Sequence, residues 1–213
     1  MKKIGEYAGS GETYDVEVVD DIAYLADWNQ GLKVLNISNP SNPLLIGQYS
    51  IAGAAIQLDI VGDFLLMSDQ RSEKTGFVVL DISDPTHPHM IESYLPDDDL
   101  WNPHVFDDYL FCGNHEVGGN ELIILDTGDP SNITEVGQFN FGSSVFSVVV
   151  SDGIAYVTGF QHGLDLIDVT DPYNPFLINS LGGVSMGRDL FVIGDYVYLA
   201  CDGHFYIIQI TAL

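Results

Sequence analysis

The sequence predicts an all-β fold, a five-bladed β-propeller with four antiparallel strands in each blade. Three observations predict it. A strand–turn–strand segment recurs five times, a third strand follows each copy, and a proline turn separates most third strands from a fourth. Equivalent residues recur every 42 to 45 positions, a period typical of propeller blades. These equivalent residues are Tyr24, Leu66, Phe111, Tyr156 and Tyr198.

Each unit begins with two short strands joined by a two-residue turn. In the first copy, residues 18–25, the turn is Asp20-Asp21, and the later copies use Gly-Asp, Asp-Asp or Asp-Gly pairs. Such pairs tolerate positive φ at low cost and favour tight hairpins. The other copies lie at residues 60–67, 105–112, 150–157 and 192–199.

The third and fourth strands of each unit flank a turn rich in proline and Asx residues. Proline fixes φ and an Asx side chain caps the turn, so each turn marks a strand end. The third strands are expected at residues 31–36, 76–81, 121–126, 163–168 and 204–209. The turns lie at 39–43, 84–88, 129–132 and 171–175, and the fourth strands at 45–49, 90–94, 135–139 and 177–181.

The fifth unit reaches Leu213 without a fourth strand. Residues 3–7 repeat the pattern of residues 45–49, so we expect the N-terminal strand to complete the last blade. Such closure removes exposed sheet edges. We therefore expect a single domain over residues 1–213. Its blades are expected near 14–50, 55–95, 101–140 and 145–182, with a fifth from 187–213 together with 1–8.

The composition limits the partners. The 213 residues include 31 acids and 6 bases, a formal net charge of −25, which argues against nucleic acid and against an anionic membrane surface. With 11 Phe, 11 Tyr and a positive mean hydropathy, the chain is not a disordered acidic tail. The charge indicates a solvated acidic surface, a salty habitat, or affinity for cations or basic partners.

Nothing in the sequence predicts membrane insertion or a disulfide framework. No stretch reaches the roughly 20 apolar residues of a spanning helix, and no apolar run follows the lysines of residues 1–6 as in a signal peptide. We expect a cytoplasmic protein if the chain is complete, or an exported one whose signal is absent from it. Cys112 and Cys201 have no metal-like spacing and cannot make a disulfide framework.

The units resemble LVIVD repeats, named for a strand such as residues 164–168 followed by the turn at 169–175. The resemblance covers nearly the whole chain, although the fifth copy departs from it, with Gln209 at the final Asp position and no proline turn. It implies a β-propeller module of secreted or cell-surface proteins. It implies no catalytic residues.

A column of polar residues occupies one repeat position of the innermost strands: Asp15, Gln57, Asn102, Ser147 and Asp189. In a propeller these strands line the central channel, so the column predicts a polar ring at the channel mouth. All of them except Ser147 are our candidate ligands for Ca²⁺, the one cofactor considered, which accepts six to eight oxygens. The alternatives are a hydrated channel wall, which we favour, and an organic ligand.

Aromatic and charged residues near this ring predict recognition of a carbohydrate or another small polar ligand, because flat stacking surfaces and directional hydrogen bonds suit such ligands. Together with the ring residues Asp15, Gln57, Asn102 and Asp189, the candidates are Tyr14, Trp28, Trp101, His104 and Arg188. The alternative, which we favour for Trp28 and Trp101, is that they only pack against the blades.

The leading hypothesis is a noncatalytic, rigid binding or scaffolding module that recognises a protein or a carbohydrate through the channel-mouth face. The alternative is a carbohydrate-active hydrolase in which Glu17 and Asp59 act as an acid and base pair. That chemistry requires carboxyl groups about 5 to 10 Å apart across the sugar. It rests on analogy of fold alone. A third interpretation is one structural unit of a longer surface protein.

Overall fold

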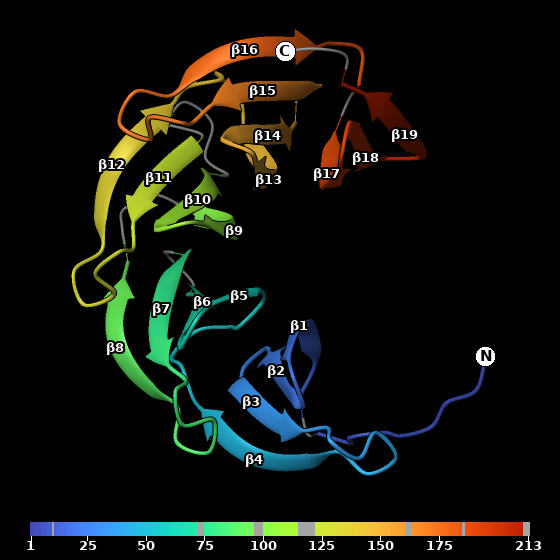
Figure 1. Ribbon diagram of the computed structural model, residues 1–213. Helices are drawn as coiled ribbons and strands as arrows, with labels where there is room; N and C mark the ends of the chain where they lie inside the picture. Colours follow the sequence, from blue (N-terminus) through green and yellow to red (C-terminus); the bar gives the residue numbers. More distant parts are fainter. Residues whose placement is uncertain are drawn as a thin grey trace. The chain divides into compact units, whose positions relative to one another are not determined.

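The computed structural model describes residues 1–9, 11–71, 75–95, 100–114, 122–160, 163–184 and 186–210, except the side chain of Trp101. Over these residues the chain is all-β and forms five antiparallel sheets of three or four strands (Figure 1). Contacts divide the chain into two compact units, Met1–Asp97 and Asp98–Leu213, and each is described by itself. None of the described residues forms a helix long and apolar enough to cross a bilayer.

Unit 1 contains two four-stranded sheets in which strand order follows chain order. The first sheet comprises β1 (Thr13–Val19), β2 (Ile22–Asp27), β3 (Gly31–Asn36) and β4 (Leu44–Tyr49). The second comprises β5 (Leu58–Val61), β6 (Phe64–Gln70), β7 (Thr75–Asp81) and β8 (His89–Tyr94). Both are meanders of the expected four strands.

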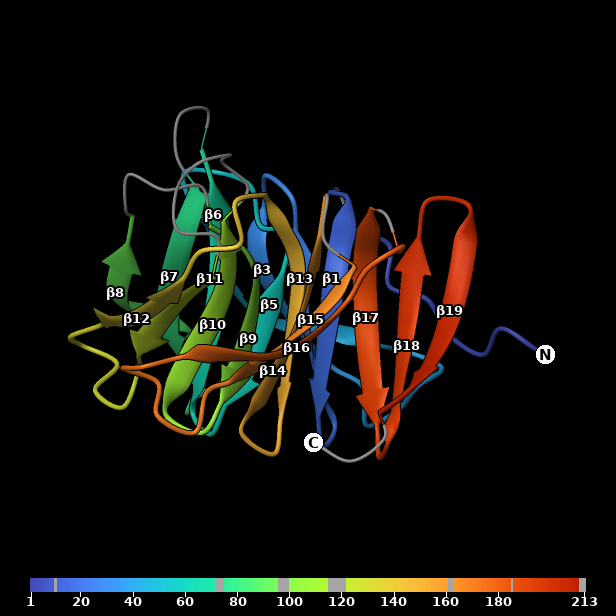
Figure 2. The same cartoon turned by 90° about the horizontal axis from the view of Figure 1, so that it is seen from above.

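Unit 2 contains the other three sheets. The third sheet comprises β9 (Leu100–Phe106), β10 (Tyr109–Asn114), β11 (Leu122–Asp126) and β12 (Thr134–Phe139). The fourth comprises β13 (Val145–Ser151), β14 (Ile154–Gly159), β15 (Leu164–Asp168) and β16 (Phe176–Leu181). The fifth has three strands, β17 (Gly187–Ile193), β18 (Tyr196–Cys201) and β19 (His204–Gln209), with β19 at its edge (Figure 2).

The N-terminal segment lies outside the sheets. Residues 1–9 belong to no strand, so the expected pairing of residues 3–7 with the last blade is not shown. Closure of the ring therefore remains a prediction.

Hairpin turns form where the sequence predicts them. The first residue of each two-residue turn has φ between 52° and 57°, the left-handed region used by tight hairpin turns. These residues are Asp20, Gly62, Asp107, Asp152 and Gly194.

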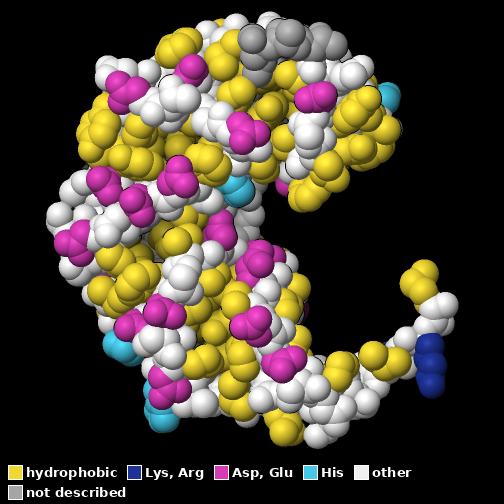
Figure 3. Space-filling model, in the orientation of Figure 1, with side chains coloured by type: hydrophobic (Ala, Val, Ile, Leu, Met, Phe, Trp, Pro, Cys, Tyr) yellow, Lys and Arg dark blue, Asp and Glu magenta, His cyan; other side chains and the backbone are white. Residues whose placement is uncertain are grey.

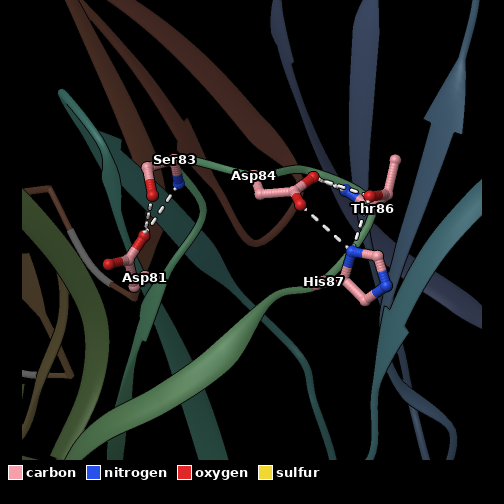
Figure 4. Close-up of polar contacts among 5 residues, drawn as sticks. All are labelled: Asp81, Ser83, Asp84, Thr86 and His87. Atoms are coloured by element: carbon pink, nitrogen blue, oxygen red, sulfur yellow. Dashed lines mark hydrogen bonds and ion pairs between the residues drawn. The ribbon is translucent and has the colours of Figure 1, made fainter.

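The proline turns are held by paired Asx motifs. In the second sheet the Asp81 carboxylate accepts hydrogen bonds from the Ser83 N–H and hydroxyl, and the Asp84 carboxylate accepts them from Thr86 in the same way (Figure 4). The same motif recurs at Asn36–Ser38, Asp129–Ser131 and Asp168–Thr170. The capping chemistry is therefore a property of the repeat.

The core lies between successive sheets within each unit. In unit 1, Tyr24, Leu32 and Val34 of the first sheet cluster with Leu65 and Met67 of the second. In unit 2 the third sheet packs on the fourth, and the fourth on the fifth, in the same manner. One face of each sheet thus packs against the opposite face of its neighbour.

Each unit also leaves one apolar face exposed. On the first sheet, Val16 and Val18 of β1 are more than half exposed. On the fifth sheet, large side chains of β17 and β19 are more than half exposed: Phe191, Ile193, Phe205 and Ile207. Acidic side chains are spread over the visible surface, whereas Lys and Arg appear there only on the N-terminal segment (Figure 3).

Candidate functional site

A β-bulge recurs at the start of the innermost strand. On β1, Thr13 pairs with Asp27 and Asp15 with Ala26, so Tyr14 is an extra residue. Phe146 on β13 and Arg188 on β17 are extra residues in the same way. A bulge bends the strand and re-aims a side chain, and bulges are common beside functional sites. Sequence reasoning selected Tyr14 and Arg188, and the bulge is the backbone feature that they share.

Tyr14 and Trp28 form an aromatic pair in unit 1. Their ring centroids are 4.8 Å apart with the planes at 29°. The Tyr14 side chain is about half exposed, and its hydroxyl lies 3.4 Å from a Glu12 carboxylate oxygen. Trp28 has φ of 24°, and its carbonyl accepts a hydrogen bond from the Ala55 N–H. The structure therefore brings these two predicted ligand residues together as a stacked surface.

Arg188 is held within unit 2. Its Cζ lies 5.3 Å from the centroid of the Phe146 ring, and its Nε and Nη2 lie 2.9 and 3.2 Å from the Asp202 carboxylate oxygens. The hydrogen bonds from Arg188 lower the pKa of Asp202. The guanidinium thus has both a ring and a carboxylate as partners.

The polar column joins neighbouring sheets. Asp15 Oδ2 accepts a hydrogen bond from the Leu58 N–H of the second sheet at 3.0 Å. Asn102 Nδ2 donates to the Phe146 carbonyl at 3.0 Å, and Ser147 Oγ donates to Asp189 Oδ1 at 3.2 Å. These contacts give the column a structural role that strand alternation did not reveal.

The other predicted polar residues are placed as follows. The Gln57 carbonyl accepts a hydrogen bond from the Ser68 N–H just before β5. His104 Nε2 lies 3.3 Å from the Val150 carbonyl of the next sheet. Trp101 pairs with Gly113 in the β9–β10 ladder, and its side chain lies outside the described part of the structure.

Calcium binding by the column remains a prediction. Among the described residues, no three His, Cys, Asp or Glu side chains gather as a metal site. The Asp15 and Asp189 carboxylates also accept hydrogen bonds from the N–H of the following residue. A calorimetric Ca²⁺ titration of the wild type and of Asp15→Ala tests the site. A wild-type titration without heat would contradict the prediction of a calcium site.

Glu17 and Asp59 lie on the innermost strands of neighbouring sheets in unit 1. Burial raises the pKa of Glu17, and the negative charges of Asp59 and Asp15 raise it further. Asp59 Oδ1 accepts a hydrogen bond from the Ile60 N–H at 2.8 Å. A carboxyl group with a raised pKa beside a second carboxylate is the arrangement that acid–base chemistry uses.

Two buried carboxylates that are not among the candidate site residues occupy equivalent positions of β2 and β6. Asp69 is fully buried and accepts hydrogen bonds from the Gly53 N–H at 2.9 Å and from Arg71 Nε and Nη2 at 3.0 and 2.6 Å. Asp27 is 2% exposed, and its Oδ1 has no hydrogen-bond partner in the described part of the chain. The signal in the sequence was an Asp three residues after Tyr24 and after Leu66.

Both cysteines are free thiols. Cys112 is fully buried, and burial raises its pKa well above the usual value. Cys201 is partly exposed, and burial together with the Asp202 charge raises its pKa.

Comparison with known proteins gives a family and a fold. The model of the LVIVD repeat matches residues 10–51, 52–96, 104–141, 142–181 and 185–212. No curated protein matches the sequence.

Solved structures share the architecture at low identity. A functionally unknown protein from Desulfotomaculum acetoxidans DSM 771 is 13% identical with a TM-score of 0.77, over 94% of this chain and 67% of that one. BamB from Moraxella catarrhalis is 18% identical with a TM-score of 0.66, over 97% of this chain and 61% of BamB. The computationally designed Ika8 protein is 13% identical with a TM-score of 0.72, over 93% of this chain and 58% of Ika8. The chain thus spans less than two thirds of the BamB and Ika8 chains, and the likeness shows the β-propeller fold alone.

Proposed function

The chain belongs to the LVIVD repeat family, and from this premise we propose that this β-propeller repeat protein is a noncatalytic, rigid binding module. In each unit the binding surface is the sheet end that carries the bulged residues, Tyr14 in unit 1 and Phe146 and Arg188 in unit 2. We place the module at the cell surface or outside the cell, where the family resemblance points, and its partner is a protein or a carbohydrate.

The recurrent bulge carries this proposal. Tyr14, Phe146 and Arg188 are extra residues at one repeat position. Sheet hydrogen bonds fix the backbone on both sides of each bulge, so a ligand that binds there orders little of the protein. A preorganised surface lowers the entropic cost of association.

We also propose that the five sheets close into a ring. The exposed face of the fifth sheet, with Phe205 and Ile207, corresponds in the repeat to the first-sheet face, with Leu32 and Val34, that packs on the second sheet. The exposed first-sheet face with Val16 corresponds to the side of the second, fourth and fifth sheets that packs on the preceding sheet of the same unit. Closure would bury both faces and give β19 a partner in residues 3–7.

Amide hydrogen exchange tests the closure. In a closed ring, alternate amides of β19 are protected by the N-terminal strand, and a chain lacking residues 1–8 loses that protection. Equal exchange of residues 204–209 in the two proteins would contradict closure by this segment.

Arrays of immobilised glycans and peptides test the binding role. We expect Tyr14→Ala to abolish or weaken binding. A matched control is Tyr173→Ala, because Tyr173 is an exposed tyrosine in a proline turn at the other end of the blades. Equal loss in both variants would contradict the assignment of the face.

The hydrolase alternative rests on the raised pKa of Glu17 beside Asp59. Turnover is measured on a panel of glycans. If the wild type cleaves a glycan and both Glu17→Gln and Asp59→Asn abolish that activity, the noncatalytic role is wrong. We expect no turnover that depends on these residues.

A further inference from the structure

The protein holds two of its own guanidinium groups, one in each unit, by two different means. In the second sheet, Asp69 binds Arg71 through two nitrogens. In unit 2, the Phe146 ring lies under Arg188, whose charge Asp202 balances. Both Arg71 nitrogens donate to the same oxygen, Asp69 Oδ2. A carboxylate that accepts charge-assisted hydrogen bonds and an aromatic face are the two surfaces that suit a planar guanidinium.

The first sheet has both surfaces at the equivalent repeat positions. Asp27 corresponds to Asp69, because each lies three residues after the marker residues Tyr24 and Leu66. Tyr14 corresponds to Phe146, because each is the bulged residue of its innermost strand. The Tyr14 ring is stacked on Trp28, the residue that follows Asp27.

The local construction around the two carboxylates is also the same. A Cβ added to Gly11 would collide with the Asp27 carboxylate, and a Cβ added to Gly53 would collide with the Asp69 carboxylate. A glycine at the start of each of these two blades therefore lets the backbone cover the carboxylate closely.

The first sheet differs from the second by lacking its own cation. Asn29 stands where the second sheet has Arg71. Asp27 has no ion pair within the described residues. Its buried Oδ1, which faces Gly11, also accepts no hydrogen bond there, whereas Asp69 Oδ1 accepts one from the Gly53 N–H. A buried carboxylate is costly unless it is paired. Arg71, whose side chain is 41% exposed, shows that a guanidinium can reach a carboxylate covered in this way from the surface.

We infer that the first sheet binds a guanidinium group supplied from outside, the arginine side chain of a basic partner, with Asp27 as counter-ion and the Tyr14–Trp28 pair as the stacking surface. The inference rests on the proposed binding role and names the chemistry that the face recognises. The net charge of −25 favours approach of a basic partner. Arginine is favoured over lysine because its planar fork binds a carboxylate through two nitrogens and stacks on rings.

Calorimetry with the full chain tests the inference. The probes are N-acetyl-arginine amide, the lysine counterpart, and the neutral citrulline counterpart. We expect arginine to bind most tightly. We expect Asp27→Asn to weaken binding at least about tenfold, the usual scale for losing a hydrogen bond to a charged group. The control Asp20→Asn removes the same charge from an exposed turn at the other end of β1, and we expect less than about a twofold change.

The inference fails if citrulline binds as well as arginine, or if Asp20→Asn weakens binding as much as Asp27→Asn. It also fails if no heat is seen at millimolar arginine amide. Thermal melting of Asp27→Asn shows whether the variant is folded, and Tyr14→Ser gives a second variant that leaves the carboxylate in place. Array binding that depends on Tyr14 but needs no guanidinium would overturn this inference and keep the binding role, whereas no array binding at all would overturn both.

Discussion

Gly5 lies against the carbonyl oxygen of Pro40, in the proline turn of the first sheet, so closely that a Cβ would collide with it. Gly47 of β4 has the same relationship to Pro85 in the second sheet, and Gly137 of β12 to Pro172 in the fourth. Each pair lies within one unit. The N-terminal segment therefore contacts the first sheet as the fourth strand of one blade contacts the next, which supports its proposed place in the last blade.

Substitution of this glycine tests the contact. We expect Gly5→Ala and Gly47→Ala each to lower the melting temperature, because forcing an extra methyl group into a packed contact costs about 1–3 kcal/mol. Gly182→Ala is the control, because a Cβ there meets nothing within 4 Å. Thermal melting of the three variants measures the effect. Identical melting of Gly5→Ala and Gly182→Ala would show that the segment does not dock.

The proline turns make the fold sensitive to acid. Hydrogen bonds from Thr86, and then from His87, lower the pKa of Asp84 from 3.8 to about 2. A pKa lowered by folding stabilises the protein above the unfolded value, and this contribution is lost as the pH falls from about 4 towards 2. Asp81, Asp129 and Asp168 have lowered pKa values for the same reason.

We expect Thr86→Val to be less stable than the wild type at neutral pH and to lose less stability on acidification. Urea unfolding at pH 6 and at pH 2.5 measures the difference. Thr134→Val, at an exposed threonine of β12, should behave as the wild type. An unchanged pH dependence in Thr86→Val would contradict the role of the hydroxyl group.

Glu17 should change the pH dependence of stability in the opposite direction to Asp84. Its raised pKa, caused first by burial and then by the charges of Asp59 and Asp15, means that ionised Glu17 opposes folding. Stability from this group is present below the unfolded pKa and is lost as the pH rises through the folded value. We expect Glu17→Gln to melt higher than the wild type at pH 7, with the difference vanishing near pH 3.5. A lower melting temperature at pH 7 would count against this electrostatic account.

Salt should stabilise the protein. With 31 acids and 6 bases, the folded chain concentrates negative charge that dissolved ions screen. We expect the melting temperature to rise between about 10 mM and 0.5 M sodium chloride, where the screening length shortens from about 30 Å to a few ångströms. Melting that is independent of salt would show that self-repulsion is not a major cost.

The strands and turns could be predicted because their causes are local. Asp20 and Asp152 adopt positive φ in turns that the sequence marks with Asp-Asp and Asp-Gly, and the Asp84–Thr86 bonds span two residues. Because each local pattern recurs in several repeats, the strands could be predicted from several copies together. Four of the five sheets have the four strands expected.

The roles of the site residues could not be predicted in the same way, because they depend on partners distant in sequence. Asp15 bonds the backbone of Leu58, 43 residues away, and strand alternation shows only which face a residue occupies. Whether a buried Asp at this repeat position has an ion pair within its own sheet depends on the residue two positions later. Arg71 provides the cation for Asp69, and Asp27 has no such partner. That difference is visible in the sequence, but its meaning requires knowing that both carboxylates are buried.

The two cysteines differ in how accessible they are to thiol-reactive labels. The Cys112 thiol stays protonated and out of reach, whereas Cys201 at the end of β18 meets solvent. Alkylating dyes react with accessible thiolates. Because burial and the Asp202 charge raise the pKa of Cys201, labelling should be slow at neutral pH. A fluorophore should still attach to Cys201 in preference to Cys112, giving a reporter on the last sheet without mutagenesis.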